Sequence, residues 1–462
     1  MIKTAVVLAA GQGTRSWPFG ETRPKAAFPI ANVPLVQRIV EGLKNAGVGR
    51  ILVVAGYRAG QVRHAVGDVE GVEFLCVANA TPTPAGTASA LLAALPAVEE
   101  EAFLVVYGDV VMAEANYATM CAVLDQADAA AVALVAPLGA EDSQDWLCAQ
   151  VVEGGVRRIV GHPRGGVTHR LCGVYVMRRD LVPYVRRNPG VMTSVEVGMM
   201  PPDEAELAQS VQDAIADGLQ VAALEVEGYF VDVDKPWHIA QANEAVAGAI
   251  LARMCGQEVA PSAHISPQAR IEGNIVLGAH SVLGPGVVVR GDLWVGAHTV
   301  LDTGAILEPN TLLGDHCRVE QYGMAGGVLG HHTRVGHASE VYGLVFGNFN
   351  THFLQFSGIV GYGTDLGAGT SCGTLRFDDR ERGVQAVRGR KEFLADGANW
   401  IYIGDYCRTG VNCAIMPGCK IGPYSVIGAG VVLNEDVPSH TLVYVEQTLV
   451  RKGWPGPDVY GW

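Results

Sequence analysis

Two basic residues and a glycine-rich turn near the start of the chain have the types and spacing needed to bind phosphate groups. The turn, Gly-Gln-Gly-Thr at 11–14, follows an apolar run at Thr4–Ala10. Small residues let main-chain N–H groups close around phosphate oxygens. Arg15 can contact two phosphate oxygens at once, and Lys25 adds a point charge. The glycines alone would equally fit an ordinary strand-to-helix turn, so the hypothesis of a phosphate site depends on the two cations.

The elements that must position these residues alternate between strands and helices over the first half of the chain. Strands are expected at Thr4–Ala10, Arg50–Ala55, Glu73–Val77, Ala102–Tyr107, Ala129–Val135 and Leu171–Met177. Helices are expected at Pro34–Ala46, Thr87–Leu95, Ala115–Gln126 and Glu204–Ala216. This alternation predicts a mostly parallel sheet with helices on both faces, and ligands of such sheets bind at the carboxyl ends of the strands.

The second half of the chain carries a six-residue repeat. An aliphatic residue recurs at every sixth position from Ile265 to Val319, and the repeat returns from Ile403 to Leu433 with Thr409 in one of its places. Neither an α-helix nor a β-hairpin has this period, whereas three hexapeptides make one coil of a parallel β-helix. We therefore expect a left-handed parallel β-helix, and we expect the interruption between about 320 and 402 to consist of loops.

Length and composition limit the function. A chain of 462 residues is too long for one ordinary core, and we divide it into a first domain at 1–235, a linker helix at 236–257, a β-helix at 258–445 and a tail at 446–462. The net charge of −14 argues against a nucleic-acid partner. No apolar run of about 18 residues occurs, which predicts no membrane span, and ten scattered cysteines suit a reduced, cytoplasmic protein.

The phosphate-binding segment resembles the signature of the sugar-1-phosphate nucleotidylyltransferases. The match runs from Leu-Ala-Ala at 8–10 through the glycine-rich turn to Glu-Thr-Arg-Pro-Lys at 21–25. The resemblance implies a Rossmann-like α/β nucleotidyltransferase domain, in which Arg15 stabilises a nucleoside triphosphate and Lys25 positions a sugar-1-phosphate. The residues that it places around the nucleotide are Leu8, Ala9, Ala10, Gly11, Gly13, Thr14, Gly86 and Thr87.

Two further segments resemble the metal-binding motifs of the same family. The strand that ends in Tyr107-Gly108-Asp109 resembles a motif whose aspartate holds Mg²⁺, and Phe230-Val231-Asp232 resembles the segment that supplies the second carboxylate. The resemblance implies Asp109 and Asp232 as ligands of Mg²⁺, which accepts few protein ligands beside phosphate oxygens. It also places Tyr107 and Gly108 at the substrate. Each aspartate alone would equally fit a turn or a helix cap.

The segments that would recognise the base and the sugar depart from the family pattern. Pro84 stands where a glutamine usually precedes the Gly-Thr-Ala at 86–88, and Gly161-His162-Pro163 lacks the usual glutamate. Leu171-Cys172-Gly173 lacks the usual asparagine but keeps the glycine, so Gly173 is still expected at the substrate. By the resemblance the nucleotide is UTP or dTTP, but the sequence leaves both the nucleotide and the sugar open.

The whole layout resembles the bifunctional enzymes that join N-acetylglucosamine-1-phosphate uridylyltransferase to glucosamine-1-phosphate acetyltransferase. The C-terminal match is Leu-Gly-Ala-Gly-Thr at 366–370 with Leu-Arg-Phe-Asp-Asp at 375–379. The resemblance implies His352 as a general base on a sugar amine, acetyl-CoA as cosubstrate, and a homotrimer or a dimer of trimers. Gln355 and Thr374 replace two supporting residues of the family, and His352 would equally fit an ordinary loop.

Three functions are compatible with these patterns. The first is nucleotidyl transfer to a sugar phosphate, with acetyl transfer as an added activity. The second keeps nucleotidyl transfer and makes the β-helix a scaffold for a trimer. The third is a non-catalytic binding or regulatory subunit. Catalysis is favoured by the combination of Arg15, Lys25, Asp109 and Asp232. A protein that only binds nucleotide sugars does not need carboxylates that hold a metal ion.

Overall fold

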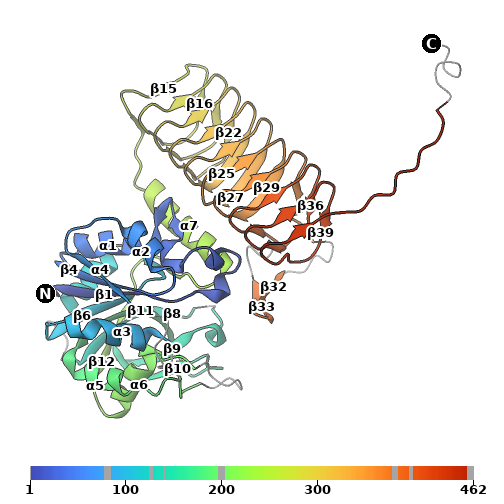
Figure 1. Ribbon diagram of the computed structural model, residues 1–462. Helices are drawn as coiled ribbons and strands as arrows, with labels where there is room; N and C mark the ends of the chain where they lie inside the picture. Colours follow the sequence, from blue (N-terminus) through green and yellow to red (C-terminus); the bar gives the residue numbers. More distant parts are fainter. Residues whose placement is uncertain are drawn as a thin grey trace.

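The computed structural model describes residues 2–77, 85–123, 128–139, 141–195, 203–376, 383–394 and 399–454. An α/β domain is followed by a long coil of short strands, and helix α7 (Pro236–Leu251) joins the two (Figure 1). Within the described ranges, no helix is both long enough and apolar enough to cross a membrane.

A nine-stranded sheet forms the first domain, in the order β5-β4-β1-β6-β11-β8-β12-β10-β9. Its strands are β1 (Thr4–Ala9), β4 (Arg50–Ala55), β5 (Val72–Cys76), β6 (Ala102–Tyr107), β8 (Ala131–Pro137), β9 (Leu147–Val152), β10 (Gly155–Gly161), β11 (His169–Arg178) and β12 (Val221–Glu225). The expectation of a mostly parallel sheet holds for β5, β4, β1 and β6. In the other half only β8 and β12 are parallel neighbours, whereas β11 runs antiparallel to both β6 and β8 and β9 and β10 form a hairpin, so the sheet as a whole is mixed.

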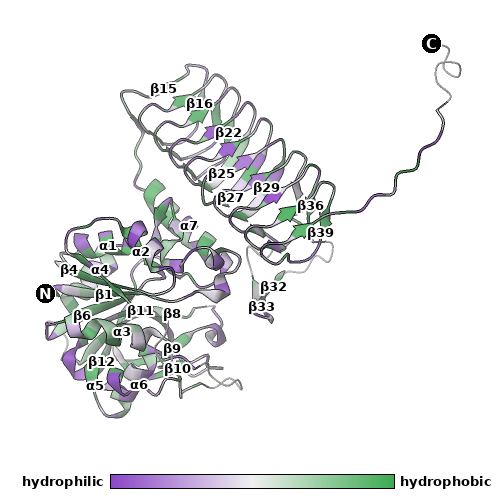
Figure 2. Ribbon diagram, viewed as in Figure 1, coloured by the Kyte–Doolittle hydropathy of each residue, from purple (hydrophilic) through white to green (hydrophobic). Residues whose placement is uncertain are grey.

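Helices cover both faces of this sheet. They are α1 (Leu35–Asn45), α2 (Ala59–Val66), α3 (Thr87–Ala94), α4 (Ala115–Val123), α5 (Val182–Arg186) and α6 (Leu207–Ala216). Successive residues of a strand point to opposite faces, so Val7 joins one hydrophobic core and Val6 joins the other. The central strands β1 and β6 are accordingly mostly hydrophobic (Figure 2). Such a two-sided core fixes the carboxyl ends of β1 and β6, where the predicted site residues lie.

The second domain is a parallel β-helix. One column of strands contains β15 (His264–Ile265), β18 (Val282–Leu283), β21 (Val300–Leu301), β24 (Arg318–Val319), β26 (Arg334–Val335), β28 (Asn350–Thr351), β30 (Asp365–Leu366), β35 (Arg408–Thr409), β38 (Val426–Ile427) and β40 (Leu442–Val443). The inward residues Ile265, Leu283, Leu301 and Val319 are partners in neighbouring coils, and this spacing equals three hexapeptides. The hexapeptide prediction of a left-handed parallel β-helix is confirmed.

The other two faces of the coil share a fifteen-stranded sheet. Its members are β14 (Gln257–Val259), β16 (Arg270–Ile271), β17 (Ile275–Leu277), β19 (Val288–Val289), β20 (Leu293–Val295), β22 (Ile306–Leu307), β23 (Thr311–Leu313), β25 (Met324–Leu329), β27 (Glu340–Val345), β29 (Gln355–Val360), β31 (Ser371–Cys372), β34 (Ile401–Ile403), β36 (Ala414–Ile415), β37 (Lys420–Ile421) and β39 (Val432–Leu433).

The expectation that the repeat stops between about 320 and 402 is wrong for most of that segment. The coils continue through β25, β27 and β29, which are six-residue strands that turn a corner of the helix without a loop. Gly327 and Gly343 lie at this corner with φ of 95° and 116°, and a Cβ on either would lie 2.2 Å from a carbonyl oxygen of the next coil. Glycine corners therefore shorten the coils, which removes the hexapeptide period from the sequence but keeps the β-helix.

A hairpin leaves the β-helix between β31 and β34. It consists of β32 (Gly383–Val387) and β33 (Arg390–Leu394), which pair antiparallel. Figure 1 shows it below the last coils, on the side of the α/β domain.

Candidate active site

Two short antiparallel strands bring the predicted carboxylates together. Strand β7 (Val110–Met112) follows β6 directly, and β13 (Phe230–Asp232) pairs with it so that Asp232 is the partner of Val110. The main-chain N–H of Val233 donates to the carbonyl oxygen of Asp109 at 2.8 Å. Asp109 and Asp232 are therefore neighbours at the carboxyl end of β6, although they are far apart in the sequence.

Lys25 is the centre of a charged cluster that comprises Arg15, Lys25, Asp109, Asp232 and Asp234. Its Nζ lies 2.7 Å from Oδ1 of Asp234 and 3.1 Å from Oδ2 of Asp109. Nε of Arg15 lies 3.1 Å from the same Oδ1 of Asp234. The side chain of Lys25 is 12% exposed, whereas that of Arg15 is 51% exposed. Lys25 is thus a buried cation between two carboxylates, and Arg15 extends from the cluster into solvent.

Opposing charges shift the pKa values in this cluster. Burial alone would lower the pKa of Lys25, but attraction to Asp234, Asp109 and Asp232 outweighs it and raises that pKa. Burial and repulsion from Asp109 and Asp234 raise the pKa of Asp232 to about 7. Burial would also raise the pKa of Asp234, but Lys25 and Arg15 lower it well below its usual range. Three carboxylates share two cations, so the cluster has room for further positive charge.

This surplus of negative charge is what a divalent cation requires. Asp109 and Asp232 supply hard oxygen donors. Burial and the neighbouring carboxylates destabilise the ionised form of Asp232, and a bound cation would compensate this effect. No group of three or more His, Cys, Asp and Glu side chains within the described ranges has the arrangement of a metal site. Two protein carboxylates fit Mg²⁺, which keeps water or phosphate oxygens in its other positions.

The glycine-rich turn lies at the surface beside the cluster. Leu8 and Ala9 are buried in β1, and Ala10 is half-buried, whereas Gly11 and Thr14 are exposed. Gly13 has φ of 66°, and a Cβ on it would lie 2.7 Å from Cγ of Lys25. Glycine is needed at this position because the Lys25 side chain packs against the turn. The main-chain N–H groups of the exposed turn can donate hydrogen bonds to a ligand, whereas the side chains of Leu8 and Ala9 belong to the core.

Thr87 is placed at the start of α3, but its hydroxyl is already fully used. It donates to Oε2 of Glu206 at 2.9 Å and accepts from the N–H of Leu207 at 2.8 Å and from the hydroxyl of Tyr107 at 3.2 Å. A nucleotide could contact this segment through the main chain of Gly86 and Thr87, while the hydroxyl holds α3 to α6. Burial, together with repulsion from the neighbouring Glu204, raises the pKa of Glu206 to about 7.

The predicted substrate residues form one contact group. Gly108 follows β6, and its N–H donates to the carbonyl oxygen of Leu8 at 2.8 Å, which ties β6 to β1. Gly173 in β11 lies against the ring of Tyr107, where a Cβ would come within 2.6 Å of Cδ2. Gly173 therefore packs against the last residue of β6, and Gly108 links the end of that strand to β1. Pro84 of the base-reading segment lies outside the described residues.

Sequence analysis missed Asp234 and His238. Asp234 makes the strongest contacts of the cluster, and the alternation Asp-Val-Asp at 232–234 is the signal that could have revealed it. His238 lies one helical turn further on, in α7, and burial lowers its pKa to about 3. A neutral imidazole results, whose Nδ1 accepts from the N–H of Asp234 at 3.3 Å. His238 thereby fixes the main chain that presents the two acids.

The β-helix is bonded directly to the signature segment. Asp405, whose side chain is 2% exposed, accepts from the hydroxyl of Thr22 at 2.7 Å and forms an ion pair with Arg23. Its other oxygen accepts from the N–H of Tyr362 at 2.8 Å. Glu21 accepts a hydrogen bond from the hydroxyl of Ser439. Arg23, which belongs to the signature, therefore has a structural role between the domains.

His352 lies on the surface of the β-helix and is not part of the charged cluster. Its Nε2 is 2.8 Å from Nδ2 of Asn350 and 3.5 Å from Oδ1 of Asp365, and its side chain is 46% exposed. Since the amide nitrogen of Asn350 can only donate, Nε2 accepts this hydrogen bond. Leu375 of the matching segment is 82% exposed, whereas Phe377–Asp379 lie outside the described residues.

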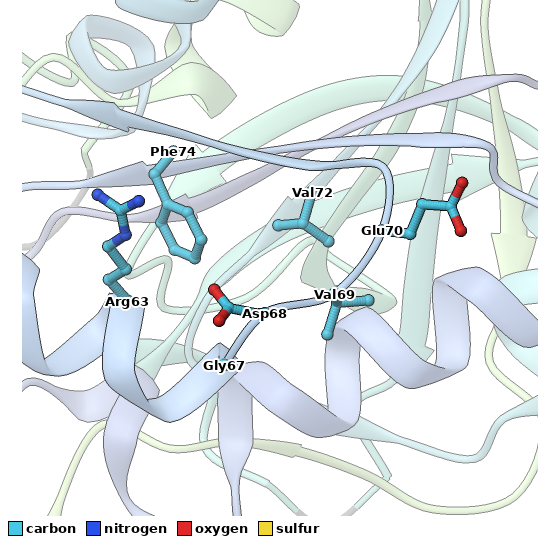
Figure 3. A pocket seen from close by; sticks show the side chains of 7 residues that line it. All are labelled: Arg63, Gly67, Asp68, Val69, Glu70, Val72 and Phe74. Atoms are coloured by element: carbon cyan, nitrogen blue, oxygen red, sulfur yellow. The ribbon is translucent and has the colours of Figure 1, made fainter.

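A surface cavity of about 300 Å³ lies at the far edge of the sheet, between the end of α2 and β5 (Figure 3). The guanidinium of Arg63 is 5.6 Å from the centre of the Phe74 ring beside it. The cavity shares no residue with the charged cluster. We therefore place the chemistry at the cluster.

Comparisons with known proteins agree with this division of the chain. Residues 5–190 match a MobA-like NTP transferase domain, and residues 401–435 match the bacterial transferase hexapeptide family with six repeats. The bifunctional protein GlmU of Methanococcus maripaludis is 29% identical over 96% of this chain and 98% of its own length. A bifunctional sugar-1-phosphate nucleotidylyltransferase/acetyltransferase of Sulfurisphaera tokodaii is 26% identical over 94% of this chain and 98% of its own.

Among solved structures, UDP-glucose pyrophosphorylase complexed with UDP-glucose has a TM-score of 0.45 at 18% identity and covers 54% of this chain and 100% of its own. The two family matches therefore fall on the two domains of the fold, the first on the α/β domain and the second on the β-helix.

Proposed function

We propose that the protein is a sugar-1-phosphate nucleotidylyltransferase, which converts a nucleoside triphosphate and a sugar-1-phosphate into a nucleoside diphosphate sugar and pyrophosphate. The observation that carries this proposal is the convergence of Arg15 and Lys25 with three carboxylates at the ends of β6 and β13. Cations for phosphates and oxygen donors for Mg²⁺ are the two requirements of phosphoryl-group chemistry. A protein that only binds nucleotide sugars would not need the carboxylates.

The reaction needs charge neutralisation more than proton transfer. An oxygen of the sugar phosphate attacks the α-phosphorus, the bond from that phosphorus to its bridging oxygen breaks, and pyrophosphate leaves with the electron pair. The raised pKa keeps Lys25 protonated, so Lys25 serves as a fixed cation for the sugar phosphate and not as a base. Arg15, which is half-exposed, can bind the triphosphate as negative charge builds on the leaving group.

Asp109 and Asp232 are the residues that would hold Mg²⁺. When bound there, Mg²⁺ would neutralise charge on the phosphates of the triphosphate. The role of Asp234 is different, because it already pairs with Arg15 and Lys25 and fixes their positions.

From the resemblance of the signature segment and of the hexapeptide layout, we propose UTP or dTTP as the triphosphate and a homotrimer, or a dimer of trimers, built on the β-helix. We take 1–235, 236–257, 258–445 and 446–462 as the limits of the nucleotidyltransferase domain, the linker, the β-helix and the tail. Sedimentation of the full chain tests the assembly, and a mass of one chain would contradict it.

Pyrophosphate release tests the proposed activity. The full chain is incubated with Mg²⁺, each of four nucleoside triphosphates and a panel of sugar-1-phosphates. At least one pair should release pyrophosphate, and Lys25→Ala should reduce that rate by about a thousandfold or more, as expected for a lost electrostatic contact at the reacting phosphates. Wild-type rates in Lys25→Ala, or no release from any pair, would refute the proposal.

Acetyl transfer is the second candidate function, supported by the partly exposed imidazole of His352 on the β-helix and by the word acetyltransferase in the name of one relative. The amine of an amino-sugar phosphate would attack the acetyl carbonyl of acetyl-CoA, lose its proton to His352 and release the thiol of CoA. Thiol release is measured with several amino-sugar phosphates, and His352→Ala should abolish it. If no substrate yields free CoA, the β-helix acts as a scaffold only.

A further inference from the structure

The hairpin β32–β33 is anchored to both domains. On the β-helix side, Nζ of Lys420 donates to the carbonyl oxygen of Ala386 at 2.7 Å. On the other side, Glu392 forms an ion pair with Lys235, and Val387 and Leu394 pack on Trp237 in a small hydrophobic cluster. All of these contacting side chains are buried except that of Glu392, which is half-buried. The hairpin is therefore held in a defined position.

This anchoring places the hairpin at the charged cluster. Lys235 follows Asp234 directly in the sequence, and Trp237 lies in the first turn of α7, which also carries His238. The partner of Glu392 is thus a neighbour of the acids that hold Arg15 and Lys25. A segment that belongs to the β-helix by sequence is connected to the catalytic segment of the other domain.

A cavity of about 290 Å³ lies between the tip of the hairpin and the signature loop. The signature loop contributes Thr14, Arg15 and Trp17, and the hairpin contributes Ala386, Val387 and Arg388. Two arginines and a threonine are therefore among the six residues that line one cavity, in a chain whose net charge is −14. Such a set of donors fits a polyanion with several phosphate groups, because each guanidinium can donate to two phosphate oxygens.

The main chain at Arg388 is unusual for an arginine. Arg388 and Gly389 form the two-residue turn between the strands, and their φ values are 48° and 79°. Glycine, asparagine and aspartate are the residues that turns with two positive φ values favour. Arginine does not stabilise this turn, so its presence there suggests that the guanidinium has a function at the tip.

We propose that the hairpin completes the nucleotidyl-transfer site and that Arg388 binds the β- and γ-phosphates of the triphosphate together with Arg15. This inference rests on the proposed function. As the bond between the α-phosphorus and the bridging oxygen breaks, negative charge grows on the leaving pyrophosphate, and the Arg388 guanidinium stabilises it. Transfer therefore depends on a side chain supplied by the C-terminal domain.

Arg388→Asn tests the proposal without weakening the turn, because asparagine accepts positive φ more readily than arginine. The variant should keep or raise the thermal midpoint of the full chain. It should also raise the KM for the triphosphate by about tenfold or more, since a charge-assisted contact is lost. Arg388→Lys, which keeps the charge but not the paired donors, should have an intermediate effect.

Arg270→Asn is the matched control. Arg270 lies in β16, at the opposite end of the β-helix. Its replacement by Asn changes the net charge by the same amount as Arg388→Asn. Binding of inorganic pyrophosphate with Mg²⁺ is measured by calorimetry for all variants. Arg388→Asn should weaken this binding by about tenfold, whereas the control should equal the wild type.

The two readouts separate this inference from the proposed function. If the wild type transfers nucleotides and Arg388→Asn has wild-type KM and pyrophosphate affinity, the role of Arg388 is refuted while the proposed function stands. If no substrate pair turns over but Arg388→Asn weakens pyrophosphate binding, the polyphosphate site stands and the proposed function fails.

Discussion

Asp234→Asn is the most informative change in the charged cluster. It preserves the shape of the side chain and one oxygen acceptor, but it removes the charge that pairs with both Arg15 and Lys25. If Asp234 fixes the two cations, the variant should lose activity through misplaced cations. If Asp234 is instead a metal ligand, the variant should lose affinity for Mg²⁺.

The magnitude follows from the two contacts. Asp234 lies 2.7 Å from Nζ of Lys25 and 3.1 Å from Nε of Arg15, and its side chain is 8% exposed. Replacing a charge-assisted hydrogen bond by a neutral one loses about 1–1.5 kcal/mol, so two contacts lose about 2–3 kcal/mol. This corresponds to a decrease of about a hundredfold in kcat/KM. Lys25 keeps Asp109 as a partner, which limits the effect on stability.

The assay is pyrophosphate release as a function of Mg²⁺ concentration. The half-saturating Mg²⁺ concentration of Asp234→Asn should stay within about threefold of the wild type, whereas Asp109→Asn should raise it by about tenfold or more. An equal rise in both variants would show that Asp234 is a ligand and that our division of roles is wrong. A wild-type kcat/KM in Asp234→Asn would refute its positioning role.

Two further predictions concern stability. Asp405→Ala leaves the half-buried Arg23 without its carboxylate and should destabilise the contact between the domains by about 3–5 kcal/mol. We expect calorimetry to show one coupled transition for the wild type and two separate transitions for the variant. A single unchanged transition in the variant would contradict this. Burial raises the pKa of Glu206 from 4.5 to about 7, so the ionised carboxylate destabilises the folded chain. This loss of stability is absent below about pH 4.5 and increases as the pH rises to about 7. Glu206→Gln should therefore increase the free energy of unfolding by up to about 3 kcal/mol at about pH 8, which raises the thermal midpoint there. At about pH 4.5 it should leave the thermal midpoint unchanged. A stabilisation that is equal at both pH values would contradict the shifted pKa.

Local sequence patterns predicted the elements that carry the site. The apolar run that ends at Ala10 and the strand that ends at Tyr107 are β1 and β6, and their carboxyl ends meet because the strands are parallel neighbours. The regular hexapeptides from Ile265 to Val319 predicted eighteen-residue coils because each coil there has the same three corners.

Patterns failed where contacts between distant residues decide the structure. Glycine corners such as Gly327 shorten the coils, so the strands continue where the period is lost. The hairpin at 383–394 carries no motif, and its position depends on Trp237, Lys235 and Lys420, which are far away in the sequence. The distinct role of Asp234 was likewise not predictable from Asp-Val-Asp alone, because only the fold brings Arg15 to it.

A crystal structure of the full chain with Mn²⁺ and a non-hydrolysable nucleoside triphosphate tests the central claim most directly. We predict an anomalous Mn²⁺ peak between Asp109 and Asp232, with the phosphates facing Lys25 and Arg15. A triphosphate bound elsewhere, or a metal that contacts neither aspartate, would contradict the assignment of this cluster as the site of nucleotidyl transfer.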